Sequence, residues 1–196
     1  MPLTPRRAFG AVAIAVGLLL TIASAPALAN SSSCSTPTLT QPFSSYGDAG
    51  WYALVPGQDA GNFTGDGWSL GNGARLVTAN IPGGASATVL QLPRGAWAMS
   101  PAMCVDPTYQ SARLMVRSVW GSPYVSASVS YQSGGGWSQP QGMGQTSTTS
   151  WWSPSAVFNL DPPSSGWQMA RFTLRGGGSN SAAQVYNFYI DPYGRG

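Results

Sequence analysis

The 196-residue sequence contains no histidine, no glutamate and no lysine. Without His there is no ordinary Ser-His-Asp or Cys-His unit and no His-ligated metal, and without Glu there is no Glu acid or base. Two of its six Asp residues could still hydrolyse a glycosidic bond if their carboxyls faced each other within about 10 Å. All six lie beside Gly or Pro or in turn-like runs, where Asp usually bonds its own backbone, although Asp191 also lies at the end of an expected strand. We therefore expect no enzyme, with an Asp-only hydrolase as a remote alternative.

Charge is scarce as well, at 8% of the residues. Arg6 and Arg7 precede an apolar run over 8–22 and small residues that end at Ala29, which predicts a signal peptide over 1–29. About 15 apolar residues fall short of the ~20 that span a bilayer, so we expect a secreted chain without a transmembrane segment. Cleavage would leave seven Arg against six Asp and lower the formal charge from +3 to about +1. This balance gives no reason to expect a nucleic-acid or membrane-surface partner.

The chain has only two cysteines, Cys34 and Cys104, and no Cys-x-x-Cys motif. In an oxidising compartment two cysteines are most simply one disulfide. Two buried thiols are the alternative. Neither interpretation gives the cysteines a metal or redox role.

Long helical patterns are also missing, and Gly, Pro and Asn separate many short strand-like runs. The expected strands are 51–55, 67–70, 75–79, 87–92, 110–119, 124–131, 155–160, 167–174 and 184–190. Strands spaced in this way predict an all-β antiparallel sandwich. We expect one such domain over 41–196, in a monomer, after a Ser/Thr/Pro-rich lead-in over 30–40.

Three of these runs alternate clearly between apolar and polar residues. In the first, Ala112, Leu114 and Val116 alternate with Arg113, Met115 and Arg117; the runs over 125–131 and 170–174 behave alike. Successive side chains of a strand point to opposite faces, so the apolar set is expected to face the core. The opposite face is expected to meet solvent or a ligand.

Several short pieces resemble a known family when taken together. They are Gln41-Pro42-Phe43, Leu54-Val55-Pro56-Gly57, the Ser100–Val105 run around Cys104, and the closing Tyr189-Ile190-Asp191-Pro192-Tyr193. In this order they resemble small secreted actinobacterial proteins of unknown function that are expected to have a galactose-binding-like domain. Gly61–Leu70, with its Gly-Asn-Phe and Gly-Trp pairs, is similar to the start of such domains. The resemblance implies a jelly-roll β-sandwich and secretion, and brings no established activity.

Galactose-binding-like modules generally bind sugars or other surface ligands, and many hold a structural Ca²⁺ near the chain ends. The pattern for that ion has an acid after the Phe and an acidic pair in the last strand. Thr64 stands in the first position and Tyr186-Asn187 in the second. These departures count against an inherited Ca²⁺ site, and we expect no cofactor.

Aromatic residues in loops are the first candidate site. Four of the eight tryptophans lie in or beside Gly/Ser/Pro-rich stretches: Trp120, Trp137, Trp151 and Trp152. An indole face can stack on a pyranose, so these residues could form a sugar site. The alternative is that they cap the open ends of the sandwich.

The second candidate is a cationic face made of Arg113, Arg117, Arg171 and Arg175. If their strands are neighbours in one sheet, the arginines could bind an acidic cell-envelope polymer. The alternative is an ordinary solvated surface. The sequence thus favours a secreted, non-catalytic module that binds carbohydrate or the cell envelope. A structural or protein-interaction domain without a sugar site is the alternative.

Overall fold

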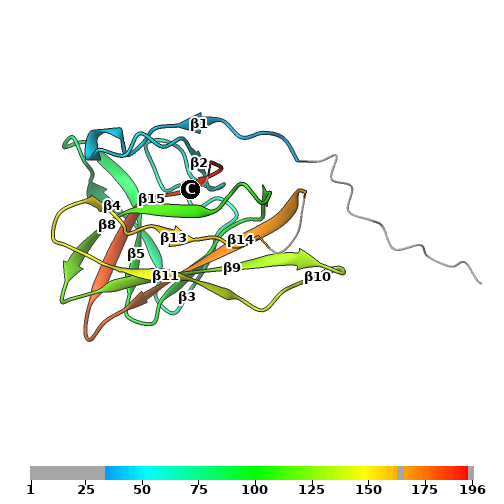
Figure 1. The fold of residues 1–196 in the computed structure, drawn as a ribbon. Coiled ribbons are helices and arrows are strands. Elements are labelled where there is room, and N and C mark those ends of the chain that lie inside the picture. The colour runs from blue at the N-terminus through cyan, green and yellow to red at the C-terminus, as the bar shows by residue number, and fades with distance from the viewer. Residues whose placement is uncertain (1–33, 163–165, 194–196) are drawn as a thin grey trace, which may run out of the picture. The chain divides into compact units, whose positions relative to one another are not determined.

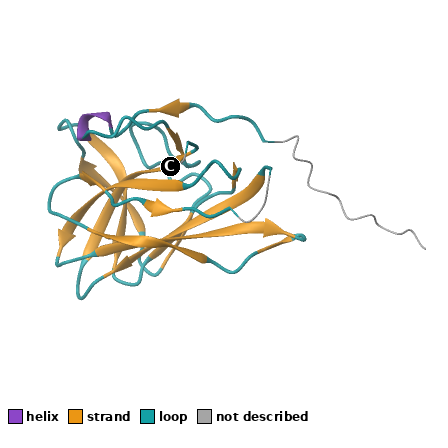
Figure 2. Ribbon diagram, viewed as in Figure 1, coloured by secondary structure: helices purple, strands orange, loops and turns teal. Residues whose placement is uncertain are grey.

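The computed structural model describes residues 34–162 and 166–193, so the expected signal peptide lies outside the described residues. The described chain forms two antiparallel sheets that pack face to face (Figure 1). In Figure 2 strands dominate, and the only helix of the described residues is the short 3-10 turn η2 (Ser44–Tyr46). No helix in this part of the chain has the length and apolar character needed to cross a bilayer. The expected disulfide-linked β-sandwich of the jelly-roll type is confirmed.

The two sheets have eight and seven strands. The eight-stranded sheet contains β1 (Leu39–Thr40), β2 (Tyr52–Leu54), β4 (Arg75–Asn80), β5 (Ser86–Pro93), β8 (Ser111–Trp120), β12 (Ser153–Pro154), β13 (Phe158–Asn159) and β15 (Ala182–Asp191). The seven-stranded sheet contains β3 (Ser69–Gly71), β6 (Trp97–Met99), β7 (Met103–Val105), β9 (Tyr124–Ser133), β10 (Gly136–Trp137), β11 (Gln141–Ser147) and β14 (Gln168–Gly177).

The strands expected from strong alternation are all present, whereas several weakly patterned ones were missed. Of the expected strand over 155–160 only β13 forms, and β12 lies just before that range; the two pair with β8 at separate places. Strand β11 was not expected, because its sequence holds two glycines and few apolar residues. It forms by pairing with β9, with a register shift between Gly142 and Gly144.

A pair of long strands runs through the middle of each sheet, β8 with β15 and β9 with β14. The chain passes from one sheet to the other between β8 and β9, and again between β14 and β15. Ala182 pairs with Trp120, and Gly177 pairs with Tyr124, so both crossovers lie at the same end of the sandwich.

The core between the sheets is built from the apolar faces that the alternation predicts. Ala112, Leu114 and Val116 of β8 are buried, as are the inward residues of β9 and β14. Phe172 of β14 and Phe188 of β15 meet across the two sheets edge to face, with ring centroids 5.4 Å apart. The predicted core face is therefore confirmed.

The opposite face of β8 is not simply solvated, contrary to the expectation. Met115 is only 5% exposed, because it packs with Phe43, Tyr52 and Tyr189 in a second apolar cluster. The Phe43 ring meets the Tyr52 ring edge to face at 4.9 Å. Alternation along β8 could not reveal this cover, because it comes from the distant segment that precedes β2. We call this side the outer face of the eight-stranded sheet.

The disulfide joins Cys34 to Cys104, as expected. Cys104 belongs to β7 of the seven-stranded sheet, and Cys34 precedes β1 of the eight-stranded sheet. The bond therefore ties the lead-in of one sheet to the edge of the other. Both expected partners are present, and the described chain holds no other cysteine.

Replacing Cys34 by Ser is expected to lower the free energy of unfolding by about 4 kcal/mol. The reason is that the bond closes a 70-residue separation and so restricts the unfolded chain. Urea unfolding of the variant and of the oxidised protein measures the loss. The reduced wild-type protein is the control and should match the variant. Equal midpoints for oxidised and reduced protein would contradict the expectation.

Gly178→Ala, in the crossover between β14 and β15, is expected to lower the free energy of unfolding by about 2 kcal/mol or more. Gly178 has φ +98°, and a β-carbon there would lie 2.5 Å from the Ser122 carbonyl oxygen in the other crossover. Gly84→Ala is the matched control, because φ is +85° but no atom lies within 4 Å. The control should lose about 1 kcal/mol. Equal losses in thermal unfolding would show that the two crossovers are not tightly packed.

Candidate functional site

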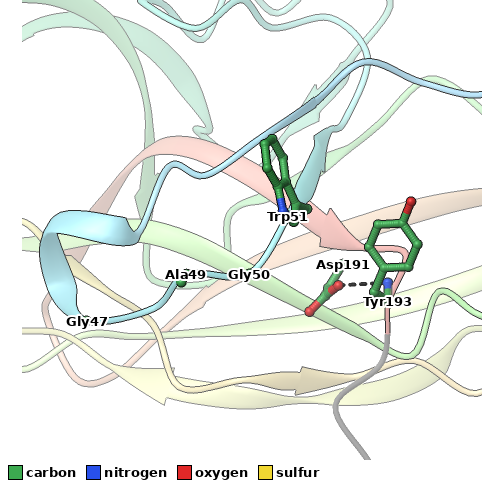
Figure 3. Close-up of a pocket in the computed structure, with 6 residues that line it drawn as sticks. All are labelled: Gly47, Ala49, Gly50, Trp51, Asp191 and Tyr193. Carbon is green, nitrogen blue, oxygen red and sulfur yellow. Dashed lines mark hydrogen bonds between the residues drawn. The ribbon is translucent and has the colours of Figure 1, made fainter.

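A hollow of about 440 Å³ opens on the outer face of the eight-stranded sheet, beside the second apolar cluster. Two distant parts of the chain form it (Figure 3). One is the segment between η2 and β2, and the other is the end of β15 with the residues that follow. The lining residues are Gly47, Ala49, Gly50, Trp51, Asp191 and Tyr193. We call it the Trp51–Tyr193 hollow.

Asp48 fixes the first wall. Its Oδ2 accepts hydrogen bonds from Arg113 Nη1 at 2.5 Å and from the Tyr52 hydroxyl at 2.7 Å. Its Oδ1 accepts the Gly50 N–H at 2.9 Å, which holds the backbone just before Trp51. Burial, and then the nearby charge of Asp191, raises the pKa of Tyr52, so its hydroxyl keeps the proton that it donates. The segment that carries Trp51 is thus anchored on β8.

Asp191 forms the polar part of the second wall. Alternation along β15 puts it on the same face as Tyr189, opposite Ile190 in the core. Asp191 is 2% exposed, and its Oδ1 accepts the Tyr193 N–H at 2.8 Å. Burial raises the pKa of this carboxyl, and the bond from Tyr193 opposes the shift in part. Among the described residues, the ion pair is formed by Arg113 with Asp48, not with Asp191.

Trp51 and Tyr193 supply the apolar part of the hollow. They are 49% and 63% exposed, and in Figure 3 both rings stand above Asp191, with Tyr193 hydrogen-bonded to it through its backbone N–H. Gly47, Ala49 and Gly50 line the rest with little side-chain bulk. The hollow therefore offers two aromatic surfaces and one carboxylate to a ligand. Asp48, next to the hollow, receives three donors from its own surroundings.

The four loop tryptophans predicted as a sugar site do not all lie together, because Trp137 is in the other sheet from the end of β8 and the loop before β12. Trp137 lies in the seven-stranded sheet, where Arg171 stacks on it at 4.4 Å from the ring centroid. Trp152 lies against the other sheet, covered by Arg117 at 4.8 Å, and its indole N–H donates to Asn80 O. Trp120 ends β8, and Trp151 is 80% exposed in the loop before β12. A single groove of all four does not form.

The predicted cationic face does not form, because it required the strands that carry the four arginines to be neighbours in one sheet. Arg113 and Arg117 belong to β8 in one sheet, whereas Arg171 and Arg175 belong to β14 in the other. All four alternate with core residues, so the two pairs point to opposite sides of the sandwich. Arg113 is moreover committed to Asp48. A single four-arginine surface therefore does not exist.

The residues of the hollow were not predicted as a site. Trp51 and Asp191 are 140 positions apart in the chain, and neither lies in a recognisable motif for chemistry. Two signals were available: Asp191 is the one Asp at the end of a strand, and Tyr193 follows it within two residues. Local sequence gave no reason to pair these residues with Trp51, because the pairing depends on β2 lying beside β15.

The residues at the positions that the resemblance relates to Ca²⁺ are hydrogen-bonded to the loop over residues 57–60. Thr64 Oγ1 donates to Gly57 O at 2.9 Å, and Asn187 Nδ2 donates to Asp59 O at 3.0 Å. The Tyr186 hydroxyl likewise donates to Ala60 O at 2.9 Å. The three groups donate hydrogens to carbonyl oxygens of the loop, whereas Asn187 Oδ1, a buried oxygen of the kind that Ca²⁺ binds, accepts no hydrogen bond among the described residues. In the described part of the chain no group of three or more acidic, His or Cys residues could hold a metal.

Asp191→Asn is expected to raise the thermal unfolding temperature at pH 7. The raised pKa means that the folded state holds the Asp191 proton more tightly than the unfolded chain. Stability is therefore lost as the pH rises through the ordinary Asp pKa to the raised one, and Asn removes that loss. The gain should vanish below the ordinary Asp pKa, at about pH 3.

Asp106→Asn is the matched control for this prediction. Its Oδ1 accepts the N–H two residues on, from Thr108 at 2.8 Å, in the same kind of turn but outside the hollow. Calorimetry of both variants at several pH values tests the expectation. A gain for Asp191→Asn that is the same at low and neutral pH would contradict it.

No family model matches this sequence, and no curated protein matches it. Three solved carbohydrate-binding modules superpose on the chain. The CBM22-1 and GH10 modules of Clostridium thermocellum xylanase 10B, complexed with xylohexaose, match at TM-score 0.48 and 13% identity, over 67% of this chain and 27% of that chain. The CBM22-1 xylan-binding domain of Paenibacillus barcinonensis Xyn10C matches at TM-score 0.46 and 14% identity, over 66% of this chain and 88% of that chain. The family 11 carbohydrate-binding module of Clostridium thermocellum matches at TM-score 0.42 and 14% identity, over 65% of this chain and 89% of that chain. Likeness of this extent assigns neither a ligand nor a site to this chain.

Proposed function

We propose that this protein is a non-catalytic carbohydrate-binding module that holds a saccharide ring in the Trp51–Tyr193 hollow. One observation carries the proposal: two exposed aromatic side chains and a buried carboxylate line a single hollow. A pyranose has C–H groups on its ring faces and hydroxyls around its edge. Aromatic rings pack against the C–H groups of the ring face, and a carboxylate accepts hydrogen bonds from the hydroxyls.

The exposure of Trp51 and Tyr193 supports this proposal. Large aromatic side chains usually bury most of their surface, but Trp51 and Tyr193 do not belong to the second apolar cluster. Phe43 and Tyr52 on the same face are almost completely buried. The two rings of the hollow thus remain available to a ligand.

The walls of the hollow also support it, because they are held before any ligand arrives. The first wall is anchored through Asp48 on β8, and the second is the end of β15, which pairs with β8 and β2. A site on rigid elements loses little conformational entropy on binding. The volume of about 440 Å³ lies within the range of small-ligand sites.

We place the protein outside the cell. The Cys34–Cys104 disulfide supports this location, since such bonds persist in oxidising compartments. The expected signal peptide agrees with it. The ligand would then be an extracellular or cell-envelope glycan.

Trp51→Ala is expected to weaken glycan binding by about thirtyfold or more, the loss typical of a central aromatic contact. Trp151→Ala is the matched control, because Trp151 is the most exposed of the described tryptophans and does not line the hollow. It should bind like the wild type. A glycan array identifies the ligand, and titration calorimetry measures the affinities.

Two results would contradict the proposal. One is the absence of binding to any glycan by the wild-type protein. The other is binding that Trp151→Ala abolishes and Trp51→Ala preserves, which would move the site to the loop before β12. Thermal unfolding of both variants confirms that each is folded.

A further inference from the structure

The two buried aspartates of the outer face differ in how their charge is balanced. Asp48 is 5% exposed and pairs with Arg113, whose other nitrogens donate to Ser155 O at 2.8 and 3.1 Å. Asp191 is 2% exposed and receives the Tyr193 backbone N–H. No cationic side chain of the described residues forms an ion pair with it. A buried carboxylate normally has such a partner.

The groups around Asp191 do not supply the missing charge. The Tyr52 hydroxyl is directed to Asp48, and the charge of Asp191 acts on Tyr52 only through space. Arg113 influences the same tyrosine but is bonded to Asp48. Arg117 is held by Gln184 and the Trp152 ring. Both arginines of β8 are thus already engaged.

The geometry points to a positively charged amino group on the bound sugar, so we propose that the Trp51–Tyr193 hollow prefers amino sugars with a free ammonium group. This inference rests on the proposed function and names its ligand class. The ammonium would meet the Asp191 carboxylate at the polar wall. The two aromatic rings of the hollow would contact the ring face of the sugar and add cation–π attraction.

A neutral sugar would bind in the hollow with lower affinity. Its hydroxyls could donate to Asp191 but would leave a buried negative charge without a counter-charge. The cost of that charge is visible in the raised pKa of Asp191. An ammonium offsets this cost, whereas an N-acetylated amino group is neutral and bulkier. The order expected is free amino sugar first, with neutral and N-acetylated sugars weaker.

The experiment compares three probes on the purified protein by titration calorimetry. They are oligomers of glucosamine, of N-acetylglucosamine and of glucose, with the same linkage and length. Glucosamine oligomers should bind roughly 5- to 30-fold more tightly than the other two, as expected for a desolvated cation over aromatic rings. The preference should shrink as salt rises, because it is electrostatic.

Asp191→Asn tests the origin of the preference. Asn can still accept the Tyr193 N–H through its amide oxygen, so the turn is kept while the charge is removed. The variant should lose most of the preference, because only the cation–π attraction of the two rings remains. Asp106→Asn, which removes a charge from the same kind of turn outside the hollow, should keep the preference.

The outcomes separate this inference from the proposed function. If Asp191→Asn loses the preference for glucosamine oligomers and Asp106→Asn keeps it, the result supports both the amino-sugar inference and the proposed function. Equal or tighter binding of the neutral probes by the wild type, still dependent on Trp51, overturns the amino-sugar inference and leaves the proposed function standing. A preference that survives Asp191→Asn places the cation elsewhere and also overturns the inference. No binding of any probe or array glycan overturns both.

Discussion

The ion pair between Asp48 and Arg113 holds the outer face of this protein together. The segment from Phe43 to Tyr52 has little regular structure of its own beyond the three-residue turn η2. Asp48 fixes it to the middle of β8 and at the same time bonds the Gly50 N–H, while the Arg113 guanidinium lies 5.3 Å from the Phe43 ring centroid. Both side chains are mostly buried, and breaking such a pair would leave a buried charge without compensation. The position of Trp51 follows from this pair.

The second wall of the hollow depends on how the neighbours of β15 are arranged. β15 pairs with β5 over its first residues and with β2 near its end, which leaves an interval between them. The side chain of Gln58 fills that interval in the manner of a strand: its Oε1 accepts the Phe188 N–H, and its Nε2 donates to Phe188 O and Val55 O. Buried backbone groups that pairing between strands would leave open are thereby satisfied. Asp191, at the end of β15, and Tyr193 just after it are therefore positioned by a strand that is paired on both sides.

Much of the fold could be predicted because its determinants are local. The alternation in β8, β9 and β14 predicted the core face, and two cysteines in a chain that was expected to be exported predicted the disulfide. Prediction ended where a residue's surroundings come from a distant segment. Met115 alternates with core residues and was assigned to a solvated face, yet Phe43 and Tyr52 cover it. Strand β11 has hardly any pattern of its own and forms because β9 presents an edge to it.

The site was harder to predict than the fold, and the reason lies in how the aromatic and cationic residues are used. Arginines and tryptophans were considered as two separate candidate surfaces, but Arg171 covers Trp137 and Arg117 covers Trp152. Each such contact satisfies a side chain that would otherwise suggest a ligand. Trp51 and Asp191 have no comparable partner among the described interactions, and nothing in their local sequence distinguishes them from the paired residues. What distinguishes them is that they line one hollow, to which two distant parts of the chain contribute.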